Sequence, residues 1–389
     1  MKPTNIVNLM ISIWIFSGWG WGVTQAAEPR ACFQSQKSDV GAKHLGDNSS
    51  VKPKLYNPNA LPSDSLKTDP SLGSSFKEWC QQRTSLSAEA RITVEVLLAE
   101  AETNDCELAA KNLSSRTELR LNQKGITDLS PLSELTNLEK LHIRFNQITD
   151  VSSLARLTNL KSLDLYGNQI TDISSLTKLT NLEWLPLGRN QITDISPLAE
   201  LTNLIGLELN KNQITDISPL AGLQNLTYLD LTQNQITDIS HLAGLTNLEV
   251  LSLGENEITD ISSLAGLTNL EVLELWDNQI TDISFVAEFT NLTSLDLTLN
   301  QIEDTSPLAG LKNLTDLRLS FNQITDISPI SGLTNLEYLF LQYNHIKDVS
   351  FLAGLTKLTS LYLEDNPIPA DSFEGILNCS PQLRCSIAN

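Results

Sequence analysis

The chain has 389 residues and a net charge of −20, from 46 acidic and 26 basic residues. A body this acidic repels phosphate backbones and anionic lipid headgroups, so nucleic acids and membrane surfaces are unfavourable partners. One apolar stretch, at the start of the chain, approaches the length of a membrane span, and no second one follows. We therefore expect no stable membrane insertion once that stretch is removed.

The first 26 residues have the organisation of a secretory signal peptide. Lys2 gives a positive start, residues 6–23 are mostly apolar, and Thr24-Gln25-Ala26 offers small residues for cleavage before Ala27. We expect residues 1–26 to be removed and the remaining chain to be secreted into a periplasmic or extracellular compartment. An uncleaved N-terminal anchor is the alternative, because the stretch is slightly long for a signal peptide.

Three segments flank a central series of repeats. Residues 27–75 are rich in Ser, Lys, Pro, Asn and Asp and are expected to be a flexible lead-in. Residues 76–112 are predicted to form a helical N-terminal cap, with Ser87 as a candidate N-cap residue. Residues 369–389 are predicted to form a C-terminal cap, with a short helix over 370–377. The apolar residues on one face of the N-terminal helix are Ala90, Val94, Leu97, Leu98 and Ala101.

The dominant feature of the sequence is an asparagine that recurs every 22 residues, with leucine five residues before it and isoleucine two residues after it. One further unit has Lys124 in the asparagine slot, so residues 113–368 comprise twelve repeats. A strict period of this length predicts a solenoid in which each coil contacts only its neighbours. The asparagine slots are filled by Asn146, Asn168, Asn190, Asn212, Asn234, Asn256, Asn278, Asn300, Asn322, Asn344 and Asn366.

A single repeat shows how the coil should form. Leu141 and Ile143 alternate with polar residues, which predicts a short strand with one buried face. Asn146 then turns inward, where its amide can bond to buried backbone groups of adjacent coils. Ile148 and Leu154 fill the interior on the return side. The strands of successive coils should form one parallel sheet, about 50 Å long at a strand spacing of about 4.8 Å.

From about Leu113 to Leu377 these units resemble the 22-residue leucine-rich repeats of bacterial internalins, which also occur in an intracellular phosphatase-regulator subunit. The resemblance implies an α/β-type curved horseshoe, with a concave parallel sheet of about twelve strands and short 3₁₀ turns on the convex side. It also implies macromolecular recognition. Unlike internalins that stay on a cell surface, this sequence shows no accessory domain or wall-sorting signal, so we do not expect wall anchoring.

An aspartate column lies four residues after the asparagine slots, and a serine stands two residues beyond each aspartate. Asp and Ser at these positions are expected to cap the convex turn by accepting backbone N–H bonds. A calcium ladder is the alternative, because aligned carboxylates bind hard cations. The column comprises Asp128, Asp150, Asp172, Asp194, Asp216, Asp238, Asp260, Asp282, Asp304, Asp326 and Asp348.

Four of the five cysteines lie near the two ends of the predicted solenoid. Cys80 and Cys106 flank the predicted cap helix, and Cys379 and Cys385 follow the last repeat. An open solenoid end exposes its core and its sheet edge, so we expect each pair to form a cap disulfide in an oxidising compartment. Cys32 is left over, as a free thiol or as a partner for another chain.

Residues that differ from coil to coil on the strand side are the candidates for binding. Outward strand positions lie six, four and two residues before each asparagine slot, and we call them the concave face. Exposed aromatic rings beside carboxylates are typical of protein-binding surfaces, and a basic surface or peptide is their complement. The candidate partner-binding residues are Tyr166, Trp184, Glu208, Tyr228, Asp230, Glu274, Trp276, Asp296, Tyr338, Phe340 and Tyr362.

No motif for catalysis, metal binding or cofactor binding stands out. The four histidines are scattered, and none has a serine or cysteine placed to pair with it. Pairs such as Glu208 and Asp230 occur wherever neighbouring repeats carry acids, so they give no specific glycosidase signal. We therefore expect an exported, non-enzymatic recognition or adhesion module that binds a protein, without cofactor or metal. The alternatives are an envelope or extracellular carbohydrate-binding protein, whose sugars would stack on the Tyr and Trp rings, and a structural spacer without a specific ligand.

Overall fold

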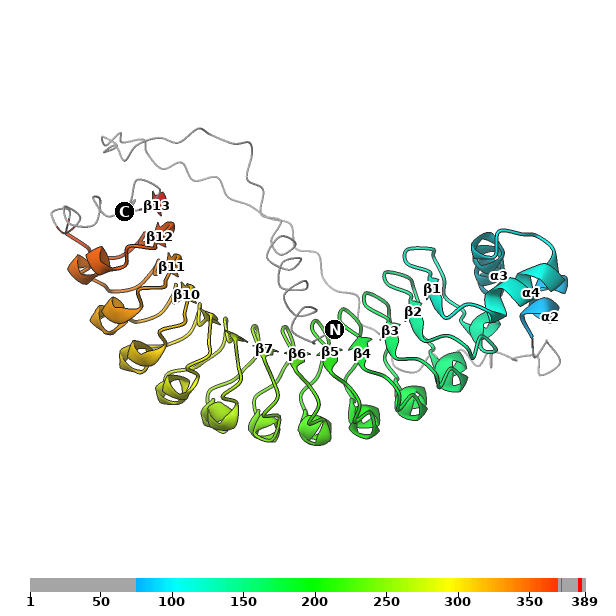
Figure 1. Cartoon of the computed structure of the whole chain (residues 1–389), viewed down its shortest axis with the longest axis horizontal. Helices are drawn as coiled ribbons and strands as arrows, with labels where there is room; N and C mark the ends of the chain where they lie inside the picture. Colours follow the sequence, from blue (N-terminus) through cyan, green and yellow to red (C-terminus); the bar gives the residue numbers. More distant parts are fainter. Residues whose placement is uncertain (1–74, 370–371, 373–383, 387–389) are drawn as a thin grey trace, which may run out of the picture. The chain divides into compact units, whose positions relative to one another are not determined.

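The computed structural model describes residues 75–369, 372 and 384–386. The chain divides into two units, Met1–Asp64 and Ser65–Asn389, and every described residue lies in the second. Its described part begins with three helices, which are followed by a regular series of coils built from one strand and one 3₁₀ helix. The strands line the inner side of the curve and the 3₁₀ helices its outer side (Figure 1). The predicted leucine-rich-repeat horseshoe is therefore confirmed.

The strands form one parallel sheet in which each pairs with the next along the chain. The register follows the repeat, so Leu207 lies opposite Leu229, which is 22 residues further on. The repeats supply twelve strands, and a thirteenth strand from the C-terminal segment, which was not predicted, pairs with the last of them. The strands are β1 (Glu118–Arg120), β2 (Lys140–His142), β3 (Ser162–Asp164), β4 (Trp184–Pro186), β5 (Gly206–Glu208), β6 (Tyr228–Asp230), β7 (Val250–Ser252), β8 (Val272–Glu274), β9 (Ser294–Asp296), β10 (Asp316–Arg318), β11 (Tyr338–Phe340), β12 (Ser360–Tyr362) and β13 (Arg384–Ser386).

Within the described residues the convex side carries eleven 3₁₀ helices, and the aspartate column opens them. Asp150 Oδ1 accepts the backbone N–H of Ser152 at 2.8 Å, and the same bond recurs along the column. This backbone hydrogen bond lowers the pKa of Asp172, because it favours the ionised form. The 3₁₀ helices are η1 (Ser130–Leu132), η2 (Ser152–Arg156), η3 (Ser174–Lys178), η4 (Ser196–Glu200), η5 (Ser218–Gly222), η6 (Ser240–Leu242), η7 (Ser262–Gly266), η8 (Ser284–Glu288), η9 (Ser306–Gly310), η10 (Ser328–Gly332) and η11 (Ser350–Gly354).

The core is a continuous column of leucine and isoleucine that runs through the stacked coils. The middle residue of each strand from β1 to β12, such as Leu229, points inward and is buried. Ile236 and Ile239 close the coil on its return, and Leu242 and Leu245 complete it, all at 0–1% exposure. Because each coil buries these side chains only against its neighbours, the sheet face opposite the core is free to vary.

The asparagine slots bond each coil to the one before it. Asn234 Oδ1 accepts the backbone N–H of Ile214 in the preceding coil at 3.1 Å. Its Nδ2 donates to the carbonyl oxygens of Leu231 at 2.9 Å and of Leu209 at 3.1 Å. Equivalent bonds recur from Asn146 to Asn366. The amide thus pairs backbone groups that would be costly to bury unpaired.

A second asparagine column, which was not predicted, lies between each 3₁₀ helix and the strand that follows it. Asn159 Nδ2 donates to the carbonyl oxygen of Thr136 in the preceding coil at 2.8 Å. The signal was present in the recurring Thr-Asn pair, which has the same 22-residue period. The column comprises Asn137, Asn159, Asn181, Asn203, Asn225, Asn247, Asn269, Asn291, Asn313 and Asn335.

The N-terminal end of the core is covered by α2 (Phe76–Gln81), α3 (Ala88–Glu100) and α4 (Cys106–Ser114). Ser87 is the N-cap of α3, as predicted, and its Oγ accepts the backbone N–H of Ala90 at 3.1 Å. The apolar face predicted for this helix is buried.

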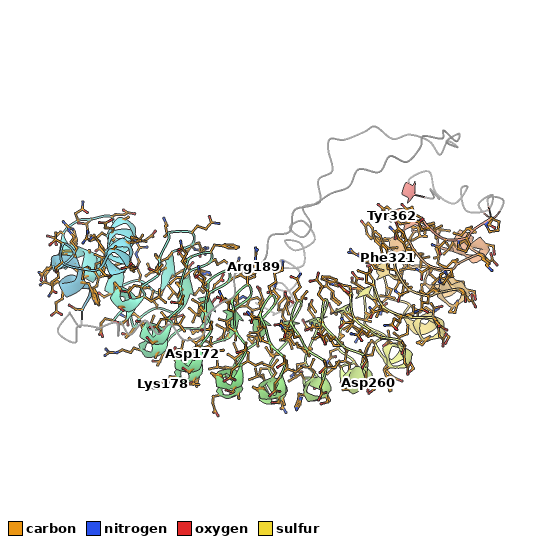
Figure 2. All side chains as sticks on the ribbon, turned by 180° about the vertical axis from the view of Figure 1, so that it is seen from behind. Asp172, Lys178, Arg189, Asp260, Phe321 and Tyr362 are labelled. Atoms are coloured by element: carbon orange, nitrogen blue, oxygen red, sulfur yellow. A yellow bond between two sulfur atoms is a disulfide. The ribbon has the colours of Figure 1, made fainter. Side chains whose placement is uncertain are left out.

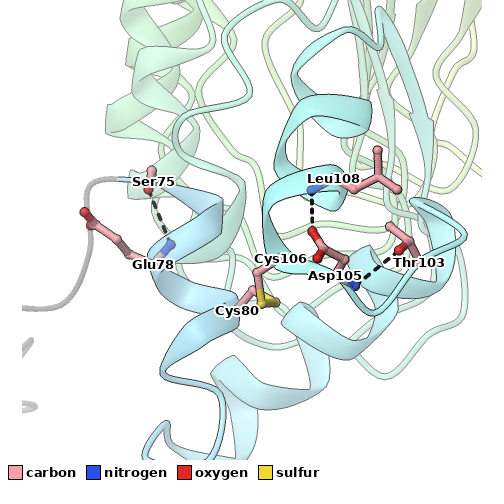
Figure 3. Close-up of a disulfide and its surroundings, with 7 residues drawn as sticks. All are labelled: Ser75, Glu78, Cys80, Thr103, Asp105, Cys106 and Leu108. Atoms are coloured by element: carbon pink, nitrogen blue, oxygen red, sulfur yellow. Dashed lines mark hydrogen bonds between the residues drawn. A yellow bond between two sulfur atoms is a disulfide. The ribbon is translucent and has the colours of Figure 1, made fainter.

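One disulfide ties this cap together. Cys80 in α2 is bonded to Cys106 at the start of α4, with their Cα atoms 5.5 Å apart (Figure 3). Cys385 lies in β13, whereas Cys379, Cys32 and the helix predicted over 370–377, apart from residue 372, lie outside the described residues. The second cap disulfide stays a prediction, as do the signal peptide and the lead-in.

Candidate functional site

The predicted partner-binding residues lie on the strand side of the coils. Most are the first or last residue of a three-residue strand, whose middle leucine points into the core, so they face the opposite way. Tyr166 and Trp276 lie two residues beyond the ends of β3 and β8. Figure 2 labels Tyr362 near the C-terminal end of this side, and Lys178, in η3, on the convex side.

Two tryptophan rings lie across glycines of neighbouring coils. A Cβ added to Gly206 would lie 1.7 Å from Cζ3 of Trp184, and that ring reaches Tyr228 with a centroid separation of 5.5 Å. A Cβ added to Gly254 would lie 2.3 Å from Cε2 of Trp276. Trp184 leans toward the C-terminal end and Trp276 toward the N-terminal end. The Trp184 ring therefore covers β5 and reaches β6, and the Trp276 ring covers the coil of β7.

Carboxylates occupy the middle of the concave face between these rings. Glu208 and Asp230 are register partners on β5 and β6, and both are largely buried. Ser252 follows on β7 and donates to Glu274 Oε2 on β8 at 2.8 Å. Asp230 Oδ1 accepts the backbone N–H of Thr232 at 3.0 Å, whereas its Oδ2 has no hydrogen-bond partner among the described residues.

Burial changes the titration of these acids. It raises the pKa of Glu208 to about 7 and that of Glu274 to about 7, and the pKa of Asp230 rises to about 6. The charge of Asp230 adds to the rise at both glutamates. Like charges on adjacent strands thus lie together in a poorly hydrated place. Within the part of the chain that the structure describes, none of the three carboxylates forms an ion pair.

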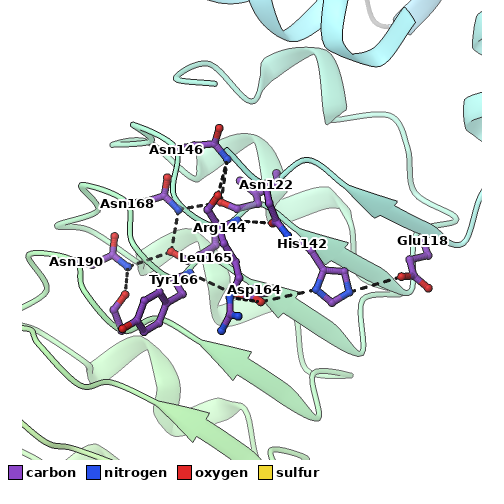
Figure 4. Close-up of polar contacts among 12 residues, drawn as sticks. Glu118, Asn122, His142, Arg144, Asn146, Asp164, Leu165, Tyr166, Asn168 and Asn190 are labelled. Atoms are coloured by element: carbon purple, nitrogen blue, oxygen red, sulfur yellow. Dashed lines mark hydrogen bonds and ion pairs between the residues drawn. The ribbon is translucent and has the colours of Figure 1, made fainter. Parts of the chain in front are cut away.

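The acids nearer the two ends of the face are paired with arginine. Arg144 Nε lies 2.7 Å from Asp164 Oδ2, and His142 lies 3.7 Å from the same carboxylate (Figure 4). At the other end, Arg318 Nη1 lies 4.0 Å from Asp296 Oδ2. The negative charge of the concave face is therefore balanced by arginine near its two ends but not in its middle.

Aromatic residues dominate the C-terminal coils. Phe340 and Tyr362 stack in parallel at 4.8 Å, and Tyr338 is 42% exposed beside them. Phe321 and Tyr343, which were not among the predicted residues, stack at 4.2 Å one residue before their asparagine slots. Large apolar residues in a slot that holds polar residues in most other coils were the signal. This position has a positive φ in the backbone: φ is +57° at Phe321 and +55° at Tyr343, a conformation that bulky residues rarely adopt.

His142 lies between two carboxylates, 3.8 Å from Glu118 and 3.7 Å from Asp164, which is a charge network on an open face. In residues 75–369, 372 and 384–386, no group of three or more His, Cys, Asp or Glu side chains is placed to hold a metal ion. No helix in the same part of the chain is both long and apolar enough to cross a membrane.

Comparison with protein families matches the repeats. A model described as Leucine Rich repeats (2 copies) matches residues 117–156, 158–200, 202–244, 246–288 and 290–332. A second, described as Leucine rich repeat, matches residues 312–368. The comparison with curated proteins gave no match.

Solved structures show the same architecture. An internalin (inlF) from Listeria monocytogenes is 39% identical with a TM-score of 0.73, and the match covers 77% of this chain and 89% of that one. A leucine-rich-repeat protein of Leptospira interrogans is 26% identical with a TM-score of 0.61, covering 69% and 75%. A plant peptide hormone receptor, RGFR1, in complex with RGF2, shares the fold at 20% identity and a TM-score of 0.51, covering 71% and 55%.

Proposed function

Because the chain belongs to the leucine-rich-repeat family, with repeats of the internalin type, we propose that it is an exported, non-enzymatic recognition or adhesion module that binds a protein through its concave face. The observation that carries the proposal is the pair of tryptophan rings, Trp184 and Trp276, seated on Gly206 and Gly254. Rings held in place lose little entropy when a partner covers them, so they are suited to act as anchors.

The charge of the face supports a basic partner. The acids between the rings have no cation paired with them among the described residues, and the chain as a whole carries a net charge of −20. A basic surface or peptide would gain from both the local and the overall field. A wide array of variable side chains on an otherwise regular sheet is what a solenoid offers for such contacts.

Export is supported by two features of different origin. The organisation of residues 1–26 is that of a signal peptide. The Cys80–Cys106 disulfide is a bond that persists in oxidising compartments and is rare in the cytosol.

A peptide selection tests the binding proposal. A library of random peptides displayed on phage is selected on the whole chain and, in parallel, on the Trp184→Ala/Trp276→Ala variant. Enriched peptides should bind the wild type and lose at least about tenfold in affinity on the variant, because central aromatic anchors typically contribute about 2 kcal/mol or more. Thr237→Ala, on the convex side, is the matched control and should bind as the wild type does.

Two outcomes would overturn the proposal. Peptides that bind all three proteins equally would place the site away from the concave face. Binding on a glycan array that depends on the same two tryptophans, with no peptide enriched, would replace the protein partner by a carbohydrate.

A further inference from the structure

The concave face contains two arginines that are held in the same way. At the N-terminal end, Arg144 Nε lies 2.7 Å from the Asp164 carboxylate. The guanidinium carbon of the same arginine lies 5.2 Å from the centroid of the Tyr166 ring. The side chain is thus held between a carboxylate and an aromatic ring, an arrangement that stabilises a guanidinium by charge and by cation–π attraction.

The C-terminal end repeats the arrangement. Arg318 Nη2 lies 2.9 Å from Asp316 Oδ2, and its guanidinium carbon lies 5.0 Å from the centroid of the Phe340 ring. Burial lowers the pKa of this arginine, but the hydrogen bond to Asp316 and the nearby carboxylates outweigh burial, so the pKa is raised overall. Two ends of one surface therefore show a ring, a carboxylate and an arginine in contact.

The middle of the face has the ring and the carboxylates but lacks the arginine. Trp184 lies over Gly206 and reaches Tyr228, on the strand of Asp230, and Trp276 lies over Gly254, in the coil of Ser252. Asp230 is fully buried, yet its Oδ2 has no hydrogen-bond partner among the described residues. A buried carboxylate oxygen without a donor is costly and points to a donor supplied from outside.

We infer that Asp230, together with Glu208 on the adjacent strand, forms the receptor for one arginine side chain of the partner, and that Glu274, two strands from Asp230, adds to the negative charge around it. This inference rests on the proposed function, since it describes the ligand of the same face. Hydrogen bonds between neighbouring strands fix the strand backbones, so the guanidinium enters by rotation of the surrounding side chains.

Arginine fits the site better than the other cations do. Its guanidinium presents five N–H donors in a planar fork, which can reach the acceptors of two neighbouring carboxylates and stack on an aromatic ring. A lysine ammonium is a compact, strongly hydrated charge that gains less from flat rings. A metal ion is disfavoured because no group of three or more His, Cys, Asp or Glu side chains converges there within the described ranges.

Binding should release protons, because a cation favours the ionised form of each carboxyl. Burial raises the pKa of Glu208 to about 7 and that of Glu274 to about 7, so both are partly protonated near neutral pH. Other charged groups that act on these three acids are Arg144, Asp164, Lys211, Asp296 and Arg318. Arg144, Lys211 and Arg318 lower the pKa values of the three acids, but these values stay above the ordinary ones. An arriving guanidinium therefore still displaces protons from the acids.

The test is a calorimetric titration of the whole chain with acetyl-arginine amide, with acetyl-citrulline amide and acetyl-lysine amide as controls. Citrulline keeps the shape of arginine without its charge, so the arginine probe should bind at least about tenfold more tightly. Titrations at pH 6.5 in two buffers of different ionisation heat should show release of at least about half a proton per arginine. The number of protons released should be smaller at pH 8.5, because the carboxyl groups are already ionised there.

Matched variants locate the site. Asp230→Asn should weaken arginine binding at least about tenfold, and Glu208→Gln, on the adjacent strand, provides the same test if the first variant folds poorly. Glu257→Gln removes an exposed acid from the coil of Ser252 and should bind like the wild type. Equal affinity for arginine and citrulline, absence of proton release, or wild-type affinity in both site variants would overturn the inference.

The peptide selection separates this inference from the proposed function. Peptides that need Trp184 and Trp276 and are enriched in arginine support both. Peptides that need the two tryptophans but contain no arginine would leave the concave recognition proposal standing and remove the arginine receptor. Peptides indifferent to the tryptophans would remove the proposed function itself.

Discussion

Replacing Asn234 with alanine measures how much the asparagine slot stabilises the solenoid. In the folded chain Asn234 Oδ1 is the acceptor for the backbone N–H of Ile214, at 3.1 Å. That N–H has no other acceptor among the described residues. An unpaired buried donor costs about 1–3 kcal/mol, and Asn234 is half-buried, so about 1–2 kcal/mol is expected from this bond.

The carbonyl groups on the other side of the amide should add little. Leu231 O accepts from Asn234 and also from Asn256, at 3.1 Å. Leu209 O accepts from Asn234 and also from Asn212, at 2.9 Å. Each carbonyl therefore keeps one donor in the variant. The expected total stays at about 1–2 kcal/mol of unfolding free energy rather than the sum of all the bonds that the side chain makes.

Two measurements check this prediction. Urea unfolding gives the loss in free energy, and hydrogen exchange at the Ile214 amide reports the lost bond directly, because long repeat arrays need not unfold in one step. Gln235→Ala is the control: Gln235 is exposed, one residue further on, and its loss should be within about 0.5 kcal/mol. Gln233 is unsuitable, since it has φ +57° and its amide donates to Glu255. Equal losses in the two variants, or unchanged exchange at Ile214, would refute the reasoning.

Three single features each have a measurable consequence. Burial raises the pKa of Glu208 from 4.5 to about 7, so the folded chain binds more protons than the unfolded chain in that window and its stability rises as pH falls from 7 to 4.5. Glu208→Gln should therefore raise the melting temperature at pH 8 and have little effect at pH 5; a lower melting temperature at pH 8 would contradict this. Gly206→Ala should displace the tryptophan ring above it and change the intrinsic fluorescence, whereas Gly222→Ala, with open space around it, should not; identical spectra would contradict the seating of the ring. Replacing Cys80 and Cys106 by serine removes a crosslink between residues 26 apart and should cost about 3 kcal/mol, seen as faster exchange in the cap helices; unchanged exchange there would count against it.

The repeat architecture could be predicted because the residues that build it are the same in nearly every coil. Leu, Asn, Ile and Asp recur in fixed slots, and each slot serves one physical purpose. The leucines and isoleucines form the core, the asparagines pair the backbone, and the aspartates cap the turn. Asp150 shows this, since its position four residues after Asn146 was enough to predict the bond to the turn that follows. Even so, the second asparagine column was overlooked, although Asn159 and its equivalents recur with the same period.

The concave face was predicted only in part, because its residues vary and their arrangement depends on neighbours. Sequence position places Trp184 on the face, but only the structure shows that it lies over Gly206 and touches Tyr228. The stack of Phe321 on Tyr343 depends on a positive φ, which no propensity indicates for such bulky residues. Strand β13 was also missed, since three residues outside the repeat carry no periodic signal.

A crystal structure of the whole chain with a peptide selected for tight binding would show directly which face binds the partner. We expect the peptide to lie across the strand side of β4 to β8, against Trp184 and Trp276, with the carboxylates of Glu208, Asp230 and Glu274 facing it. A peptide bound to the convex 3₁₀ helices or to the N-terminal cap, with the concave face open, would contradict recognition through the concave face.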